Sequence, residues 1–321
     1  MSVLVYTENW DGKFKKSSFE LVSYAAKVAD MLGTNLTAVS IGNVDNEELN
    51  LLGNYGAQKI LKVEDDKVNN LDNQAYTGIL SHIAKSENAE IIVISHNNTG
   101  KALAPRLSAR LKAACGSGVI KLPLSLEPFT IRKKVFSGKA FAKVVLKTDI
   151  KILTLMQNSF EVIEAENNST IEVFAADFDD PVTIVKDVQK QTGRILLTDA
   201  EIVVSGGRGM RSPDNWGAII DLAEELGAAL ACSRPVSDEG WRPHEEHTGQ
   251  TGKIIAPNLY IAAGISGAIQ HMAGVSSSKC IVAINNDADA PVFEYADYGV
   301  VGDAIKVLPA LTEAVKEAKN N

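Results

Sequence analysis

The chain has 321 residues, of which 45% are hydrophobic and 22% charged, and its formal net charge is −8. This length favours about two domains, and the composition excludes a mainly disordered or fibrous chain. No apolar run reaches the roughly 18 residues that a membrane helix needs, so we expect no direct insertion into a membrane. Three scattered cysteines (Cys115, Cys232, Cys280) predict neither a disulfide framework nor a zinc site.

The charge is unevenly distributed. The segment from Leu196 to the end holds 9 basic and 17 acidic residues, a net −8, whereas the preceding part holds 23 of each and is neutral. An acidic C-terminal half disfavours a nucleic-acid surface, which requires a basic patch. No secretory signal precedes the first strand-like run, so we expect a cytoplasmic protein; a mitochondrial-matrix location would require that a transit peptide has been removed.

Residues 1–95 alternate between strand and helix patterns, which is typical of a doubly wound parallel sheet. Ser17 or Ser18 is expected to cap a helix that runs through Leu32, with Gly33 as its stop. The expected strands are 2–8, 35–42, 58–65 and 89–96, and further helices are expected at 46–52 and 72–85.

The stretch 100–118 predicts a loop and a helix, and three successive β-runs follow at 139–147, 150–156 and 171–178. We interpret these runs as an antiparallel edge or extension of the first domain. The polar segment 179–192 predicts a boundary near residue 190. The chain is therefore divided into an N-terminal α/β domain, 1–190, with a doubly wound nucleotide-hydrolase-like sheet, and a C-terminal parallel-sheet domain, 191–321.

The second domain repeats the α/β alternation. Strands are expected at 201–205, 228–233, 259–264 and 280–285, and helices at 213–226, after Ser266 and at the C-terminus. We expect Pro309 to interrupt the C-terminal helix or to open a second one at its first turn.

Polar and glycine-rich segments follow four of these strands. They are SGGRGM (205–210), Ser233-Arg234-Pro235, the stretch 264–271, and Asn285-Asn286-Asp287. Ligands of open parallel sheets bind outside the carboxyl ends of the strands, so these segments predict a site for one large ligand. Glycines would let backbone amides approach the ligand, and the helix after Gly267 would offer its N-terminus to a phosphate.

Two common nucleotide motifs are absent. SGGRGM does not have the G-x-G-x-x-G spacing, and no ribose-binding acidic residue follows the next strand. HTGQTGK (247–253) has His247 where a phosphate loop needs its first glycine, and Lys253 is followed by isoleucine. Neither NAD nor a Walker-type nucleotide is indicated. The run HEEH (244–247) lacks the spacing of a zinc-binding helix, so we expect no metal.

Several candidate residues also have a structural interpretation. Gln250 and Thr251, with Gly252, could form an ordinary turn. Arg208 could form a surface salt bridge, Arg234 could be a loop charge, and His271 could be a satisfied helix histidine. Asn285 could cap a strand, and Asp303 could cap the last helix.

The run LYIAAGISGAIQHMAGVSSSKCIVAIN (259–285) resembles the signature of the electron transfer flavoprotein α subunit. The similarity extends over VSGGRGM, ACSRP, TGQTGKIIAPNLY and FEYADYGVVGD, and more weakly over GKALAPRLSARL. It implies a heterodimer with a β subunit that carries AMP or a second FAD, while the second domain of this chain holds most of an FAD. It also implies electron transfer from acyl-CoA dehydrogenases and related flavoenzymes to a membrane quinone oxidoreductase.

The resemblance also implies the cofactor contacts. Arg234 matches the arginine beside the flavin ring, where a fixed guanidinium would stabilise an anionic flavin semiquinone, and His271 is the second residue expected to act on the ring. The remaining expected FAD contacts are Arg208, Ser233, Gln250, Thr251, Ser266, Gly267, Ala268, Ile269, Gln270, Asn285 and Asp303.

Three functions are compatible with the sequence. The first is an electron carrier without a small-molecule substrate of its own, for which classification as an enzyme stays open. The second is the α subunit of an electron-bifurcating flavoprotein, and the third is a non-redox nucleotide-binding module.

Overall fold

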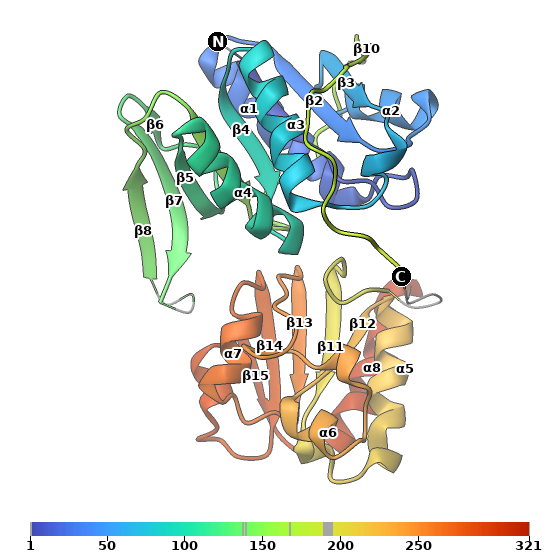
Figure 1. Ribbon diagram of the computed structural model, residues 1–321. Coiled ribbons are helices and arrows are strands. Elements are labelled where there is room, and N and C mark those ends of the chain that lie inside the picture. The colour runs from blue at the N-terminus through green and yellow to red at the C-terminus, as the bar shows by residue number, and fades with distance from the viewer. Residues whose placement is uncertain (1, 137, 139, 167, 189–194, 321) are drawn as a thin grey trace. The chain divides into compact units, whose positions relative to one another are not determined.

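The computed structural model describes residues 2–136, 138, 140–166, 168–188 and 195–320. The chain divides into two compact units, Met1–Val188 and Gln189–Asn321. Both units are α/β, and each is built around one sheet (Figure 1). Among the described residues, no helix combines the length and the apolar character that crossing a bilayer requires.

The first unit is a doubly wound sheet with the strand order β10-β3-β2-β1-β4-β9-β5-β7-β6, and β8 pairs with β7. Successive residues of β1 point to opposite faces. Val3 and Val5 pack with helices α1 and α2, whereas Leu4 and Tyr6 pack with α3 and α4. The elements are β1 (Ser2–Tyr6), α1 (Lys16–Leu32), β2 (Leu36–Ile41), α2 (Asn46–Gly53), β3 (Lys59–Val63), α3 (Asn73–Ser86), β4 (Ala89–Ser95), α4 (Asn98–Leu111), β5 (Ala114–Val119), β6 (Ser125–Leu126), β7 (Phe129–Val135), β8 (Ala140–Val145), β9 (Lys151–Leu155) and β10 (Thr170–Val173).

The predicted antiparallel extension is only partly present. β6, β7 and β8 are antiparallel neighbours, but β9 is inserted between β4 and β5 and runs parallel to both. β10 runs parallel to β3 at the other edge of the sheet. Ile152 and Leu153 of β9 are fully buried, so a run that is apolar on both faces lies at the centre of the sheet. The three consecutive β-runs suggested an antiparallel edge or extension. β9 is apolar on both faces, and it lies instead inside the parallel part of the sheet.

Two local predictions in this unit were wrong. The helix α1 begins at Lys16 rather than at the expected serine cap, and Lys15 at its N-cap makes no side-chain cap hydrogen bond. Its predicted end is confirmed, because Gly33 adopts the left-handed conformation with φ 65°. The stretch after α4 also differs from the prediction, because Ala114–Val119 is a strand, β5, that completes the parallel part of the sheet.

The second unit has a five-stranded parallel sheet with the order β12-β11-β13-β14-β15. Tyr260 and Ala262 of β13 pack in the core with α7, whereas Ile261 and Ala263 pack with α5 and α8. The chain reverses its direction of winding between β11 and β13, which makes this pair the topological switch point. The elements are β11 (Ile202–Gly206), α5 (Gly217–Leu226), β12 (Ala229–Cys232), α6 (Arg234–Asp238), β13 (Leu259–Ala263), α7 (Ile269–Val275), β14 (Cys280–Asn285), β15 (Tyr298–Val301) and α8 (Ala304–Asn320).

The prediction for Pro309 was also wrong. This residue lies inside the continuous helix α8. Proline lacks the amide that would donate to Ile305, so the helix forgoes one backbone hydrogen bond. Leu308 is fully buried beside it in the same core as Leu222 of α5, and this packing compensates for the missing bond.

Candidate functional site

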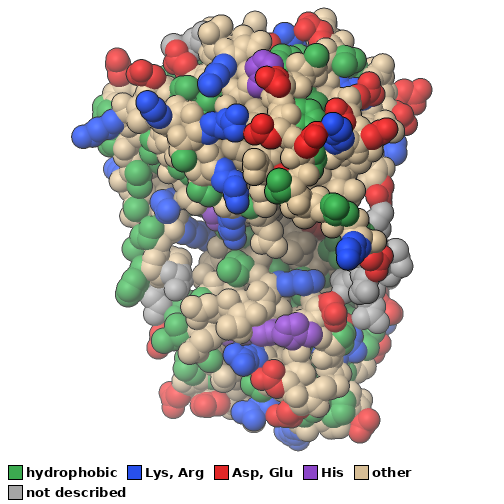
Figure 2. Space-filling view, viewed as in Figure 1, with side chains coloured by type: hydrophobic (Ala, Val, Ile, Leu, Met, Phe, Trp, Pro, Cys, Tyr) green, Lys and Arg blue, Asp and Glu red, His purple; other side chains and the backbone are tan. Residues whose placement is uncertain are grey.

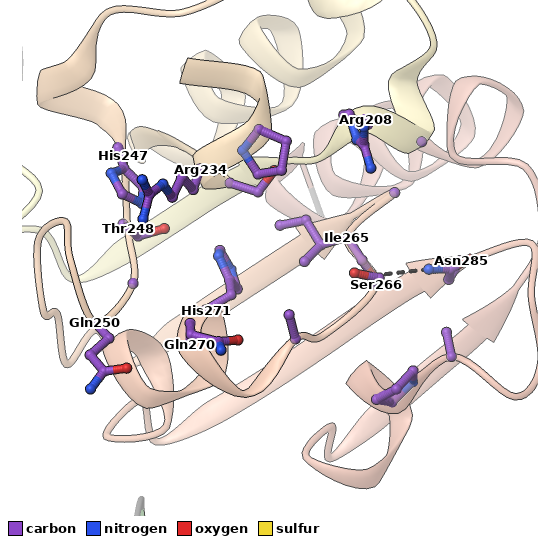
Figure 3. Close-up of a pocket in the computed structure, with 18 of the residues that line it drawn as sticks. Arg208, Arg234, His247, Thr248, Gln250, Ile265, Ser266, Gln270, His271 and Asn285 are labelled. Atoms are coloured by element: carbon purple, nitrogen blue, oxygen red, sulfur yellow. Dashed lines mark hydrogen bonds between the residues drawn. The ribbon is translucent and has the colours of Figure 1, made fainter. Parts of the chain in front are cut away.

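A cavity of about 570 Å³ opens at the carboxyl ends of β11, β12, β13 and β14 (Figure 3). Its volume is within the usual range of small-molecule and cofactor sites. The segments that the sequence singled out after these four strands all contribute to its wall. The lining residues are Arg208, Gly209, Ser233, Arg234, Pro235, His247, Thr248, Gly249, Gln250, Thr251, Gly264, Ile265, Ser266, Ala268, Gln270, His271, Asn285, Asp287, Ala290 and Pro291.

Glycines let the loops after β11 and β13 pack directly on each other. A Cβ on Gly207 would lie 2.2 Å from the carbonyl oxygen of Gly264, and one on Gly209 would lie 2.6 Å from the Gly264 Cα. The Gly209 amide donates to that same carbonyl at 2.9 Å. We expected these glycines to present amides to a ligand. In the structure, the Gly209 amide instead hydrogen-bonds the Gly264 carbonyl. The glycines therefore allow the two loops to pack together at the base of the site.

Two arginines stand at the cavity with only weak ionic partners. The Arg208 Nη1 lies 3.7 Å from Glu239, and the Arg234 Nε lies 3.3 Å from Asp238. Both side chains are more than half exposed, at 66% and 62%. Arg234 was expected on a loop, but it is the first residue of α6, with Pro235 at the next helical position. Pairs that are this exposed contribute little to stability, so both guanidinium groups are available to an anionic ligand.

On the face drawn in Figure 2, Lys and Arg side chains are interspersed with Asp and Glu side chains. The charged side chains that line the cavity are Arg208, Arg234 and Asp287, so its wall carries a small excess of positive charge in a unit that is acidic overall.

Two buried histidines line the inner part of the cavity. His271 is 7% exposed, and its Nε2 lies 2.7 Å from the hydroxyl of Tyr260. Burial lowers the pKa of His271 to about 4, so the ring is neutral at pH 7. His247 is 3% exposed, and burial followed by the neighbouring His244 lowers its pKa. Within the described residues, neither histidine has a hydrogen-bond partner at Nδ1.

The smaller polar residues are fixed through their backbones. The Gln250 amide donates to the Gln270 carbonyl at 2.7 Å, and the Ser266 carbonyl accepts from Val292 at 3.0 Å. Asn285 uses its side chain, which donates to the Ile265 carbonyl at 2.9 Å (Figure 3). Asn285 therefore holds the loop after β13 in place, and this contact explains why an amide side chain ends β14.

The cavity contains most but not all of the residues proposed from the sequence. Ten of the thirteen line it: Arg208, Ser233, Arg234, Gln250, Thr251, Ser266, Ala268, Gln270, His271 and Asn285. Gly267 instead packs on Val292, where a Cβ would lie 2.2 Å from the amide nitrogen, and Ile269 is 69% exposed. Asp303 lies outside the cavity wall, accepts from the Ile305 amide at 3.1 Å and pairs with Arg211 at 2.8 Å. The helix-capping interpretation accounts for its contacts in this structure.

The sequence analysis did not propose His247 and Thr248. Thr248 is fully buried, and its amide donates to the Cys232 carbonyl at 3.0 Å, which brings the segment beside β12. Arg242 and Glu246 form a nearly buried ion pair just before it. We rejected HEEH as a metal motif, and among the described residues no cluster of three metal-ligating side chains occurs. Thr248 begins the run TGQTGKIIAPNLY that carries part of the family resemblance, so that run was a signal for Thr248, whereas His247 precedes it and belongs to no motif that we identified.

The fold and the cavity define a two-domain α/β protein with a ligand site at the carboxyl ends of a parallel sheet. Residues 3–179 match the electron transfer flavoprotein domain, and residues 196–276 match the electron transfer flavoprotein FAD-binding domain. The chain belongs to the electron transfer flavoprotein family, as an alpha subunit.

Full-length relatives support this assignment. The electron transfer flavoprotein subunit alpha of Bacillus subtilis is 36% identical over 319 residues, which are 98% of this chain and 97% of the relative. The subunit of the same name from Syntrophomonas wolfei is 37% identical over 316 residues, covering 98% of both chains. The acryloyl-CoA reductase electron transfer subunit beta of Anaerotignum propionicum is 33% identical over 356 residues, covering 99% of this chain and 96% of the relative.

The residues present fit an FAD. The site offers two exposed guanidinium groups to an anionic pyrophosphate. Polar side chains such as Ser266 and Gln270 also line the cavity and can hydrogen-bond a large polar cofactor.

Proposed function

We propose that this chain is the FAD-carrying subunit of a heterodimeric electron carrier, and that it holds one FAD without a covalent bond. One observation carries the proposal: four loops at the switch point of the parallel sheet converge on one cavity that contains ten of the residues expected from the family resemblance. The match to an FAD-binding domain covers the same loops except the one after β14.

The residues of the site would have two roles: some would bind the FAD, and others would contact the flavin ring and set its reduction potential. Arg208 and the loop that includes Ser266 would bind the pyrophosphate or the adenosine half, because a guanidinium pairs well with phosphate oxygens. Arg234 would lie at the flavin ring, and Gln270 and His271 would donate to the ring carbonyls or to the ribityl chain. The FAD supplies the electron-transfer chemistry, so the protein requires no nucleophile or general base.

We further propose a β subunit as the partner, carrying AMP or a second FAD, and a cytoplasmic location. Acyl-CoA dehydrogenases and related flavoenzymes would supply the electrons, and a membrane quinone oxidoreductase would receive them. We place much of the β-subunit contact on the first unit, because residues 1–195 carry 23 basic and 23 acidic residues and therefore no net charge that would repel a partner.

A second candidate is the α subunit of an electron-bifurcating flavoprotein. The relative named as an electron transfer subunit of acryloyl-CoA reductase favours it, because that name couples the family to a reductase. Reduction of the purified heterodimer by NADH would support this candidate. Reduction only by a dehydrogenase and its acyl-CoA substrate would support the simple carrier.

The test of the proposal is the cofactor content of the complex, co-expressed with the β subunit encoded by the same organism. We expect a flavin absorption spectrum and, after acid precipitation, one FAD in the supernatant for each α chain, beyond any held by β. A correctly folded complex without flavin would contradict the proposal and favour a non-redox nucleotide-binding module.

A further inference from the structure

Tyr260 contacts the cavity through a histidine. This tyrosine lies on β13, is fully buried in the core between the sheet and α7, and directs its hydroxyl at Nε2 of His271 with a 2.7 Å separation. It does not line the cavity itself. The hydroxyl of a buried strand residue thus hydrogen-bonds a histidine that lines the ligand site and is labelled in Figure 3.

The hydrogen-bonding capacity of the two groups limits how they can pair. Burial raises the pKa of Tyr260, so the phenol keeps its proton at neutral pH. Among the described residues, the hydroxyl has one hydrogen-bond partner that can accept this proton, Nε2 of His271, because the Thr248 hydroxyl donates to the Cys232 carbonyl and the Ser205 hydroxyl has no partner. A neutral imidazole has one nitrogen that accepts and one that donates.

We propose that Tyr260 is a positioning residue that donates its hydroxyl proton to Nε2 of His271, and thereby holds the imidazole as the tautomer with its proton on Nδ1. The inference rests on the proposed function only for the identity of the ligand. The proton on Nδ1 then lies on a buried edge of a ring that lines the cavity.

The backbone around His271 supports this role. The His271 amide donates to the Ala268 carbonyl at 2.9 Å, and the Gln270 carbonyl accepts from Gln250 at 2.7 Å. The main chain at the start of α7 is thus fixed from both sides. The tautomer and the direction of the ring are then set by what Nε2 meets, and that partner is Tyr260.

The direct test is the tautomer of His271, read from long-range ¹⁵N–¹H correlations of the ¹⁵N-labelled α chain in complex with unlabelled β subunit. The signals of His271 are assigned by their loss in His271→Gln. We expect the pattern of a ring protonated at Nδ1 at neutral pH. A ring protonated at Nε2 would overturn the proposal. This readout does not depend on electron transfer, and a complex that lacks flavin would refute the proposed function without removing the tautomer signal.

A second test measures FAD affinity in a double-mutant cycle of Tyr260→Phe and His271→Gln. Tyr260→Phe removes one oxygen, and we expect it to weaken FAD binding about threefold to tenfold, the effect of one hydrogen bond. In the His271→Gln background the same change should have no further effect. The matched control is Tyr76→Phe, which removes a buried hydroxyl that donates to the Val68 carbonyl at 2.8 Å in the first unit. Equal losses from Tyr260→Phe in both backgrounds would show a structural role only and overturn the proposal.

Discussion

Arg234 offers the sharpest test of how this chain would tune a bound flavin. Its guanidinium lies at the cavity with Asp238 as its ionic partner at 3.3 Å, and its side chain is 62% exposed. Reduction adds negative charge to the flavin ring, so a fixed positive charge beside the ring stabilises the reduced form more than the oxidised form. Arg234→Ala should therefore lower the potential at which the flavin takes up its first electron.

The structure limits the size of this effect. A charged hydrogen bond contributes about 1.5–3 kcal/mol. Arg234 is exposed and shares its charge with Asp238, so we expect the lower end, about 1.5 kcal/mol, or about 65 mV for one electron. Arg234→Lys should retain part of the effect, because lysine keeps the charge but loses the planar guanidinium. Asp238→Asn should raise the potential, because it removes the competing carboxylate.

The assay is a spectroelectrochemical titration of the FAD-loaded complex. Arg211→Ala is the matched control, because Arg211 is 61% exposed, pairs with Asp303 at 2.8 Å and does not line the cavity. It removes the same charge and should leave the potential nearly unchanged. If Arg234→Ala behaves like this control while FAD stays bound, Arg234 is a surface charge and the reasoning is refuted.

Three further predictions concern the cofactor, the loops and pH. All flavin should leave the protein on acid precipitation, and colour retained in the pellet would reveal a covalent bond. Gly207→Ala should cost about 2–3 kcal/mol of stability and weaken FAD binding, because its Cβ would meet Gly264. The control Gly217→Ala, with nothing within 4 Å of its Cβ at the start of α5, should leave FAD binding unchanged and should not lower the stability, because alanine is favoured over glycine in a helix. Thermal unfolding and FAD titration measure the two effects. The pKa of His271 is lowered from 6.5 to about 4, so between these pH values the unfolded chain protonates this histidine and the folded chain does not. The free energy of unfolding should therefore fall as the pH drops from 6.5 to 4, by about 3 kcal/mol at most for this group. Denaturant unfolding of wild type and His271→Gln should show that difference in slope, and parallel pH profiles would contradict it.

The sequence predicted most of the parallel framework because hydrophobic pattern and burial agree there. The run 280–285 became β14 and Gly33 ended α1, since each depends on local chemistry alone. The position of β9 was not predictable in this way, because pairing with β4 and β5 depends on segments far away in the chain. Pro309 shows the same limit: the packing of Leu308 against α5 overrides the local preference of proline.

At the candidate site, the rule that ligands bind at the carboxyl ends of parallel strands brought together residues from four loops. Asp303 follows a fifth strand and lies outside the cavity wall, where it caps the last helix at the Ile305 amide and pairs with the distant Arg211. His247 enters the wall because its segment lies beside β12, a tertiary contact that no spacing in the sequence encodes. The Tyr260–His271 bond likewise required the structure, because a tyrosine within a strand is most simply a core residue.

The central claim is that FAD occupies the cavity of the second unit, and blocking that cavity tests it most directly. Ser266 is exposed at the cavity wall, so Ser266→Trp should fill the space without disturbing the core. The measurement is the FAD content per α chain of the purified wild-type and Ser266→Trp complexes, each released by acid and quantified side by side. We expect one FAD held by the wild-type α chain and almost none held by the variant. A folded variant that retains the full FAD content would place the cofactor elsewhere and contradict the claim.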